Sequence, residues 1–244
     1  MGSNRWTWNK IQGIIQGINL KFAELLIPLP SLEKQQEIVD EIEQYQKVID
    51  GARLVVDNYE PSVILNSDWE SLEIKDIGEV ISGGTPKTTE ETFWGGDVNW
   101  VTLKDFGEIN NIKFIDNSDR KITDTGLKKS SAKLIPVNSV IVSTRATIGK
   151  VAINSIELST NQGCKSLVID DKKHNPLFIA VQLLNKRKEL QDLATGGTFK
   201  EISTTNYKKI KLLIPNVDTQ NEIAENIVNE LKVINSNLEL IESM

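Results

Sequence analysis

Apolar side chains recur at steps of three and four residues in two long stretches of the chain, the spacing of one face of an α-helix. This pattern predicts helices over Ser31–Asn58 and Asp218–Glu242. Ser31 and Asp218 are predicted N-caps, because a short oxygen-bearing side chain can accept hydrogen bonds from the free amides at a helix start. The apolar positions expected to join the two helices are Ile38, Ile42, Tyr45, Ile49, Val56, Ile223, Ile227, Leu231, Ile234 and Leu238.

Each predicted helix begins inside a segment that occurs twice. Asn19–Ile42 and Asn206–Ile227 align with one gap, and each consists of a short apolar strand, a proline that stops it, a turn and a helix. Similar long helices on both sides of one domain favour pairing with each other, and the alternative is that each packs only on its own domain. Residues 1–30 match the tail of a preceding domain.

Between the two helices the pattern changes to short alternating segments and glycine-bearing turns. Val137–Ile153 alternates like a pair of strands, and Lys165–Asp170 is a further strand. Asn175–Ala194 carries a helical stripe that begins with an asparagine cap and Pro176 in the first turn. We therefore expect an α+β fold in which a β-rich domain is flanked by two long helices.

Composition and charge narrow the class of protein. The hydrophobic content of 39% fits a soluble globular protein without a membrane partner, and the single cysteine, Cys164, suits a reducing cytoplasm. The net charge of −6 belongs to the two ends, because Lys113–Lys150 holds eight basic and three acidic side chains. This segment is a candidate surface for a polyanion, and the alternative is an ordinary solvated face.

Motifs for catalysis are missing from the sequence. No G-x-G-x-x-G follows a predicted strand and no Walker-type phosphate loop occurs, so no cofactor is expected. The lone His174 has no histidine or cysteine cluster around it, so no metal site is expected either. The segment His174–Phe178 is similar to the Asn-Pro-Pro-aromatic loop of amino-methyltransferases, but a helix cap explains the same residues. We expect a protein without catalytic residues.

Seven motifs in a fixed order resemble the DNA-specificity subunit of type I restriction–modification systems. They are IPLPSLEKQQEI (Ile27–Ile38), W-x-x-L-x-I-x-D-I-G (Trp69–Gly78), SGGTP (Ser82–Pro86), FWGGDVNWVTLKD (Phe93–Asp105), STRATIGKVAI (Ser143–Ile153), STNQGCKSL (Ser159–Leu167) and GGTFKEIS (Gly196–Ser203). The resemblance implies target-recognition domains that each read one half of a bipartite DNA site, and long helices that pair antiparallel. Its layout for this chain is a remnant of a preceding recognition domain (1–30), a spacer helix (31–66), a target-recognition domain (67–213) and a distal helix (214–244).

The resemblance also implies partners. These are double-stranded DNA, the methyltransferase (modification) subunits that dock on the helices, and the restriction subunit of the same complex. Because the chain holds only one complete recognition domain, two copies could associate as a homodimer through their helices and read an inverted repeat.

Candidate DNA contacts follow from the chemistry of the loops within this layout. Glycines let the backbone approach phosphates, and lysines together with Arg120 supply a salt-sensitive grip on phosphates. Groups that can read bases are carried by Arg145, Asn161, Gln162, Lys104 and Asp105. The full set is Thr85, Lys87, Lys104, Asp105, Lys113, Arg120, Lys121, Lys128, Lys129, Lys133, Arg145, Thr147, Asn161, Gln162, Lys165, Thr198 and Lys200.

Several of these residues have a purely structural alternative. Trp94 and Trp100 favour a place in the core over base stacking, Arg145 has a carboxylate pair as its alternative, and Asn161–Gly163 has a turn. For the whole chain the competing function is a helical adaptor that binds protein and not DNA, which its acidic ends would suit. An enzyme with an unrecognised site is the least favoured class.

Overall fold

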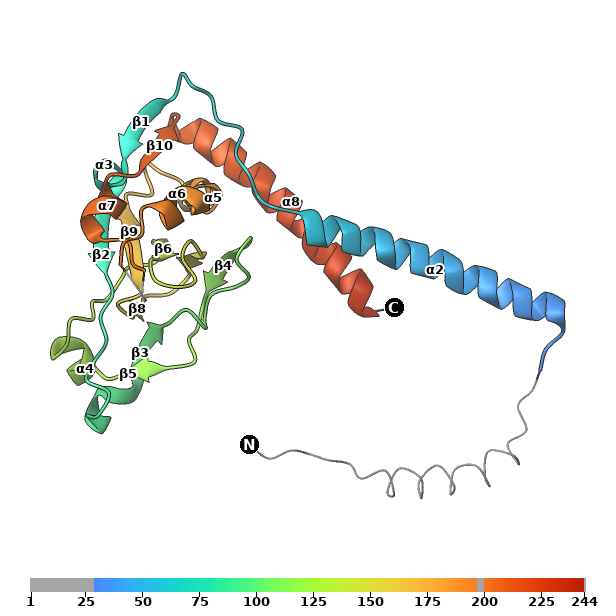
Figure 1. The fold of residues 1–244 in the computed structure, drawn as a ribbon, viewed down its shortest axis with the longest axis horizontal. Coiled ribbons are helices and arrows are strands. Elements are labelled where there is room, and N and C mark those ends of the chain that lie inside the picture. The colour runs from blue at the N-terminus through green and yellow to red at the C-terminus, as the bar shows by residue number, and fades with distance from the viewer. Residues whose placement is uncertain (1–28, 197–199, 244) are drawn as a thin grey trace.

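Two long helices and a β-rich domain make up the protein (Figure 1). The computed structural model describes residues 29–196 and 200–243, so residues 19–28 of the first repeat copy, nearly all of the predicted domain remnant (1–30) and Thr198 lie outside the described residues. In chain order the elements are α2 (Leu32–Asn58), β1 (Glu70–Glu73), α3 (Ile74–Ile77), β2 (Gly78–Ser82), η1 (Glu91–Phe93), β3 (Trp94–Val101), β4 (Ile112–Ile115), β5 (Lys121–Ile122), α4 (Asp124–Lys128), β6 (Val140–Ser143), β7 (Val151–Asn154), β8 (Ser159–Thr160), β9 (Cys164–Ile169), α5 (Pro176–Asn185), α6 (Arg187–Asp192), α7 (Thr204–Lys208), β10 (Lys211–Ile214) and α8 (Val217–Ser243). The predicted α+β class, with a β-rich domain between long helices, is confirmed.

Three sheets organise the domain. The largest has five strands in the order β2-β9-β6-β7-β4, a second has three strands in the order β5-β3-β8, and β1 pairs with β10. The strand pair predicted within Val137–Ile153 is β6 and β7, which pair antiparallel with Val140 opposite Ile153. The three-stranded sheet and α4 form one end of the domain, away from the long helices (Figure 1).

Alternation along β6 divides its side chains between two cores. Val140 and Val142 are fully buried beneath α5, in the same apolar cluster as Phe178. Ile141 points to the opposite face of the sheet, where it packs with Val101 and other residues of the second cluster. A strand that is buried on both faces needs apolar side chains at consecutive positions, which explains the sequence Val140-Ile141-Val142.

The helix predicted over Asn175–Ala194 is broken into α5 and α6 at Lys186. Its start is as predicted, because Asn175 Oδ1 accepts from the amides of Leu177 at 2.9 Å and Phe178 at 3.2 Å. The Asn175 side-chain amide also donates to Asn221 at 2.8 Å, which ties this cap to α8.

The predicted long helices are confirmed as α2 and α8. Ser31 caps α2 as predicted, with Oγ accepting from the Lys34 amide at 3.3 Å. The predicted cap of the second helix is wrong by two residues, because Asn216 Oδ1 accepts from Thr219 N at 2.9 Å and Asp218 already lies inside α8.

The apolar stripe of α8 packs first on the domain core and then against α2. Ile227 is buried and Ile223 and Leu231 are half-buried against the main core of the domain. Further along, Ile234 is buried where α8 contacts α2, and Ala52 is the buried residue of α2. The helix therefore packs on its own domain with one half and on the other helix with its second half.

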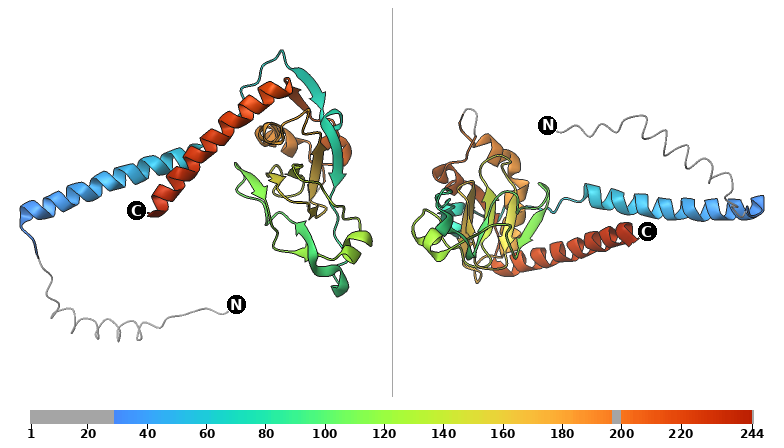
Figure 2. Two further views of the ribbon diagram at one scale, coloured as in Figure 1. Left: turned by 180° about the vertical axis from the view of Figure 1, so that it is seen from behind. Right: turned by 90° about the horizontal axis from the view of Figure 1, so that it is seen from below.

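The two helices run in opposite directions and overlap over only part of their length (Figures 1 and 2). Ile49 and Val56 of α2 are half-buried. The N-terminal half of α2 extends past the end of α8, so Ile38, Ile42 and Tyr45 remain 43%, 59% and 51% exposed. These three side chains, and Leu238 on α8, do not make the buried seam that the periodicity predicts.

The segment between α2 and β1 is fastened to the domain by side chains. Tyr59 Oη donates to Glu230 on α8 at 2.9 Å. The Asn110 side-chain amide donates to Glu60, and Arg187 donates in turn to Asn110 and to the carbonyl of Ile109. These contacts hold the direction in which α2 leaves the domain. Within the described residues, no helix is long and apolar enough to cross a membrane.

Candidate nucleic-acid interface

Loops from four distant parts of the sequence meet at one pocket of about 400 Å³ beside the three-stranded sheet. We call it the tryptophan pocket. It is lined by Thr85, Trp100, Thr102, Leu103, Lys104, Arg120, Asn161 and Gln162. Five of these eight residues belong to the set that the sequence suggests as DNA contacts, namely Thr85, Lys104, Arg120, Asn161 and Gln162.

Backbone hydrogen bonds between the loops build the pocket. The Gly84 amide donates to the carbonyl of Thr160 at 2.8 Å, and the Asn161 amide donates to the carbonyl of Val101 at 2.9 Å. Gly83 passes so close to the next segment that a Cβ on it would lie 1.9 Å from the Asn161 carbonyl oxygen. The glycine pair of the motif SGGTP is therefore needed for the close approach of two backbones.

Trp100 lines the pocket and Trp94 supports it from behind. Trp100 is buried and its indole N–H donates to the carbonyl of Gly84 at 2.9 Å. Trp94 packs edge-on against it, with ring centroids 5.0 Å apart and planes at 85°. The guanidinium of Arg120 lies over both rings, 4.0 Å from the Trp94 centroid and 4.9 Å from that of Trp100. Trp100 thus has the core position that its residue type favours, and it also shapes the pocket.

Exposed lysines lie on the three-stranded sheet, on α4 that packs against it, and on loops. Lys121 lies on β5, Lys128 is the last residue of α4, and Lys129 is its C-cap. The start of α4 is capped by Thr123, whose Oγ1 accepts from Gly126 N at 3.0 Å. Lys87 and Lys133 are exposed on loops. Long cationic side chains on exposed positions can follow a phosphate backbone without a fixed geometry.

Asp105 and Lys113 line a second hollow of about 380 Å³ that also includes Lys104. The carboxylate of Asp105 holds its own loop together, because it accepts from Thr102 N at 2.7 Å, Thr102 Oγ1 at 2.9 Å and Asp119 N at 2.9 Å. Both oxygens accept from the turn, so a structural role accounts for Asp105, and its role in base reading stays a prediction.

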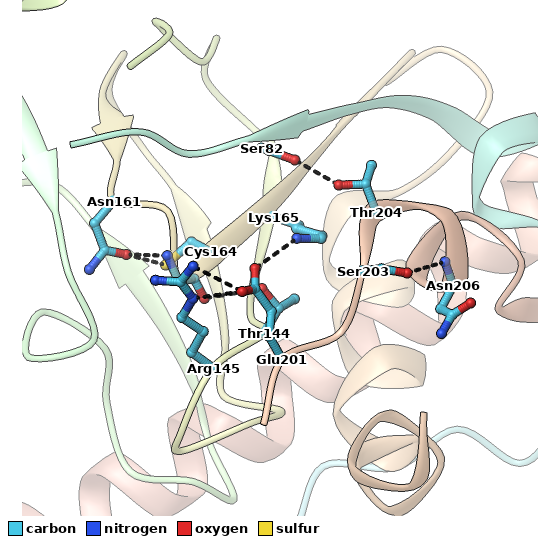
Figure 3. A network of polar contacts seen from close by, with 11 residues as sticks. Ser82, Thr144, Arg145, Asn161, Cys164, Lys165, Glu201, Ser203, Thr204 and Asn206 are labelled. Carbon is cyan, nitrogen blue, oxygen red and sulfur yellow. Dashed lines mark hydrogen bonds and ion pairs between the residues drawn. The ribbon is translucent and has the colours of Figure 1, made fainter. Parts of the chain in front are cut away.

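Arg145 makes an ion pair with a carboxylate, which was the structural alternative to base reading. Its Nε donates to Glu201 Oε2 at 2.9 Å, and the same carboxylate lies 3.8 Å from the ammonium of Lys165 (Figure 3). The Lys165 side chain is only 3% exposed. Burial lowers the pKa of Lys165, and Glu201 opposes that shift. Lys165 is thus out of reach of a duplex, which corrects its place among the expected DNA contacts.

The remaining expected contacts lie near this ion-pair cluster. Thr147 is exposed on the loop after Arg145, and its carbonyl accepts from Ser143 Oγ at 2.6 Å. Lys200 is exposed next to Glu201. Burial raises the pKa of the Cys164 thiol to about 12, so this cysteine stays neutral.

Sequence reasoning missed two features of the site. Glu201 is the centre of the ion-pair cluster, and only its presence in the motif GGTFKEIS could have drawn attention to it. The stacking of Arg120 on two tryptophans, 26 and 20 residues away in sequence, carries no local sequence signal. Both features depend on contacts between segments that periodicity does not relate.

Comparison with known proteins shows which family the chain is similar to. The model of the type I restriction modification DNA specificity domain matches residues 66–240. The type I restriction enzyme MjaIX specificity subunit of Methanocaldococcus jannaschii is 34% identical over 158 residues, which are 64% of this chain and 36% of that protein. The EcoR124I/EcoR124II specificity subunit of Escherichia coli is 28% identical over 229 residues, 84% of this chain and 55% of that protein.

Solved structures agree in fold. The HsdS subunit of Thermoanaerobacter tengcongensis superposes with a TM-score of 0.56 at 18% identity and covers 88% of this chain and 57% of that one. A chain from a study of complex assembly in the type I R-M system gives a TM-score of 0.58 at 19% identity, covering 89% and 56%. The chain thus spans between about a third and somewhat more than half of the length of these relatives. Because the family model matches most of its length, this chain belongs to the family of type I restriction modification DNA specificity domains.

Proposed function

We propose that this protein acts in the cytoplasm as a non-catalytic, sequence-specific DNA-binding module of a type I restriction–modification complex, reading one half of a bipartite site. The observation that carries the proposal is the convergence of Thr85, Lys104, Arg120, Asn161 and Gln162 on the tryptophan pocket. Residues scattered over 78 positions would not be expected to meet in one pocket if they were unrelated surface groups.

The roles divide by chemistry. Exposed lysines on β5, α4 and the loops neutralise phosphates and release counterions, which gives affinity without sequence information. Side chains held inside the pocket face base edges, where paired hydrogen-bonding groups distinguish one base pair from another. The layout implied by the family resemblance assigns α2 and α8 to the docking of methyltransferase subunits, and the restriction subunit is a further partner of the same complex.

Removing two phosphate-gripping lysines tests the DNA-binding function. We expect Lys128→Ala with Lys129→Ala to weaken binding to all duplexes alike and to reduce the slope of log K against log salt by roughly two, because each phosphate contact contributes about 0.9. Binding would be measured by fluorescence anisotropy at several salt concentrations, with duplexes selected from a random pool and with unselected ones.

The matched control is Lys172→Ala with Lys173→Ala, an adjacent pair of exposed lysines on the turn before α5 that removes the same charge. Its salt slope should equal that of the wild-type protein. A wild-type protein that binds duplexes without salt dependence and enriches no sequence would instead support the competing function, a helical protein-binding adaptor.

We further propose that two copies of the chain associate through the N-terminal half of α2. The apolar surface formed by Ile38, Val39, Ile42, Tyr45 and Val48 is 43–59% exposed and continues the face on which α2 meets α8. An apolar helix face of this length is expected to pair with another helix. A second copy supplies an identical face, and the two antiparallel rods would place one recognition domain at each end.

Ile42→Glu tests this association. A carboxylate at the centre of the apolar face would be left without a partner in the dimer, so we expect the mass in solution to fall from that of a dimer to that of a monomer at micromolar concentration. Sedimentation equilibrium measures the mass. Gln44→Glu adds the same charge on the other side of the helix and should remain dimeric. A monomeric wild-type protein would rule the dimer out.

A further inference from the structure

Arg120 differs from the other arginines of the domain. Arg145 is paired with Glu201, and Arg187 donates to the Ile109 carbonyl and to Asn110. Among residues 29–196 and 200–243, the guanidinium of Arg120 has no carboxylate within ion-pair distance and donates no hydrogen bond. Its contacts are the faces of Trp94 and Trp100, at 4.0 and 4.9 Å.

This arrangement orders the side chain without using its donors. A guanidinium that lies over aromatic rings is attracted by their negative faces, and this contact uses none of its N–H donors. The indole N–H of Trp100 is fixed to Gly84, and Trp94 Nε1 donates to the Lys87 carbonyl at 3.3 Å, so both rings are themselves held in place. An arginine that only grips phosphates needs no such fixed platform.

The charged groups of the tryptophan pocket, Lys104 and Arg120, are both donors. Its side-chain oxygens make hydrogen bonds within the pocket wall, because Gln162 Oε1 accepts from Thr85, Asn161 Oδ1 accepts from the Gly163 amide at 3.0 Å, and Thr102 Oγ1 donates to Asp105 at 2.9 Å. The fork of Arg120 and the ammonium of Lys104 can therefore donate to a ligand, and side-chain amide N–H groups add further donors.

A donor-rich pocket matches one base in particular. In the major groove guanine presents two acceptors, O6 and N7, whereas cytosine presents a donor, adenine one of each and thymine a single acceptor beside its methyl group. We propose that Arg120 is a specificity-determining residue that reads a guanine through a bidentate contact, and that Trp94 and Trp100 position it for this contact. The inference rests on the proposed DNA-binding function and changes the role of Arg120 from a phosphate contact to a base reader.

Arg120→Lys provides the test, because it keeps the charge and removes the fork. Bound duplexes would be selected from a random pool with wild-type and variant protein, and affinities compared for duplexes that differ only at the enriched guanine. We expect discrimination at that one position to fall about tenfold, while the other positions and the salt slope are unchanged. Arg53→Lys makes the same exchange on the exposed surface of α2 and should change neither quantity.

A second pair of variants separates positioning from contact. Trp94→Leu should reduce discrimination at the same guanine without changing the salt slope, and Trp94→Phe, which retains a ring for stacking, should restore most of it. Thermal unfolding of each variant checks that the domain remains folded, and Arg120→Gln supplies another side chain without a fork that must lose the same preference.

Two results would overturn the inference while leaving the proposed function intact. One is an undiminished guanine preference in Arg120→Lys and Arg120→Gln. The other is a uniform loss of affinity for all duplexes in Arg120→Gln with a smaller salt slope, which would identify a phosphate contact. A wild-type protein that enriches no sequence from the pool would be a failure of the proposed function itself, and the two failures are therefore distinct.

Discussion

Trp100→Ala is expected to lower the free energy of unfolding by about 3–5 kcal/mol, because it empties a large buried site and removes a hydrogen bond at once. The side chain is 3% exposed, shares a small core with Ile122 and Ala132, and supports Trp94 from the side. Urea unfolding followed by circular dichroism measures the loss. Since the ring also forms the wall of the tryptophan pocket, the residual folded protein should lose its sequence preference.

Trp100→Phe separates the two contributions to that loss. Phenylalanine keeps an apolar ring in the core but cannot donate to the Gly84 carbonyl, 2.9 Å from the indole nitrogen. The expected loss is smaller, about 1–2 kcal/mol, for one hydrogen bond left unmade and a small reduction in volume. An Ala variant as stable as the Phe variant would contradict the central position assigned to this tryptophan.

Gly83→Ala should also have a large effect, through the backbone. The added methyl group would lie 1.9 Å from the Asn161 carbonyl oxygen and 2.4 Å from Thr160 Oγ1, so the two loops must separate. We expect a loss of about 1–3 kcal/mol in the free energy of unfolding, as for other overpacked sites. Because the same loops carry Thr85 and Gln162, selective duplex binding should fall as well, by a larger factor than binding to unselected duplexes.

Gly51→Ala is the matched control for that substitution. Gly51 lies within α2, and a Cβ there meets nothing within 4 Å. The identical chemical change should therefore stabilise the helix by about 0.5–1 kcal/mol, because alanine has the higher helix propensity. Opposite signs for the two glycines, measured by thermal unfolding, would show that close approach decides the effect. A neutral Gly83→Ala would mean that the loops are not held together at this point.

The exposed half of α2 resembles the part of α8 that packs on the domain. The aligned repeat makes Ile38 and Ile42 the counterparts of Ile223 and Ile227, which pack on the domain core. The exposed half of α2 thus carries the same type of face that α8 uses to bind a recognition domain. This chain spans about half of some of the specificity subunits that it matches.

Periodicity alone determined the long helices and the strand pair. The presence and approximate extent of α2 and α8, the Ser31 cap, the Asn175 cap with Pro176, and the paired β6 and β7 all follow from interactions between residues close in sequence. Local hydrogen bonds and the side-chain direction along a helix or strand are fixed by the neighbouring residues, so the amino-acid order is sufficient to predict them.

Tertiary structure decided what covers each of these faces. The stripe of α8 is continuous in sequence, but the domain core covers one part, α2 covers another, and Leu238 stays exposed. Lys165 has the sequence character of a DNA contact and is buried beside Glu201, while Arg120 lies free over two tryptophans. Burial and pairing depend on segments brought together by the sheet, often dozens of residues apart, and a local pattern contains no information about them.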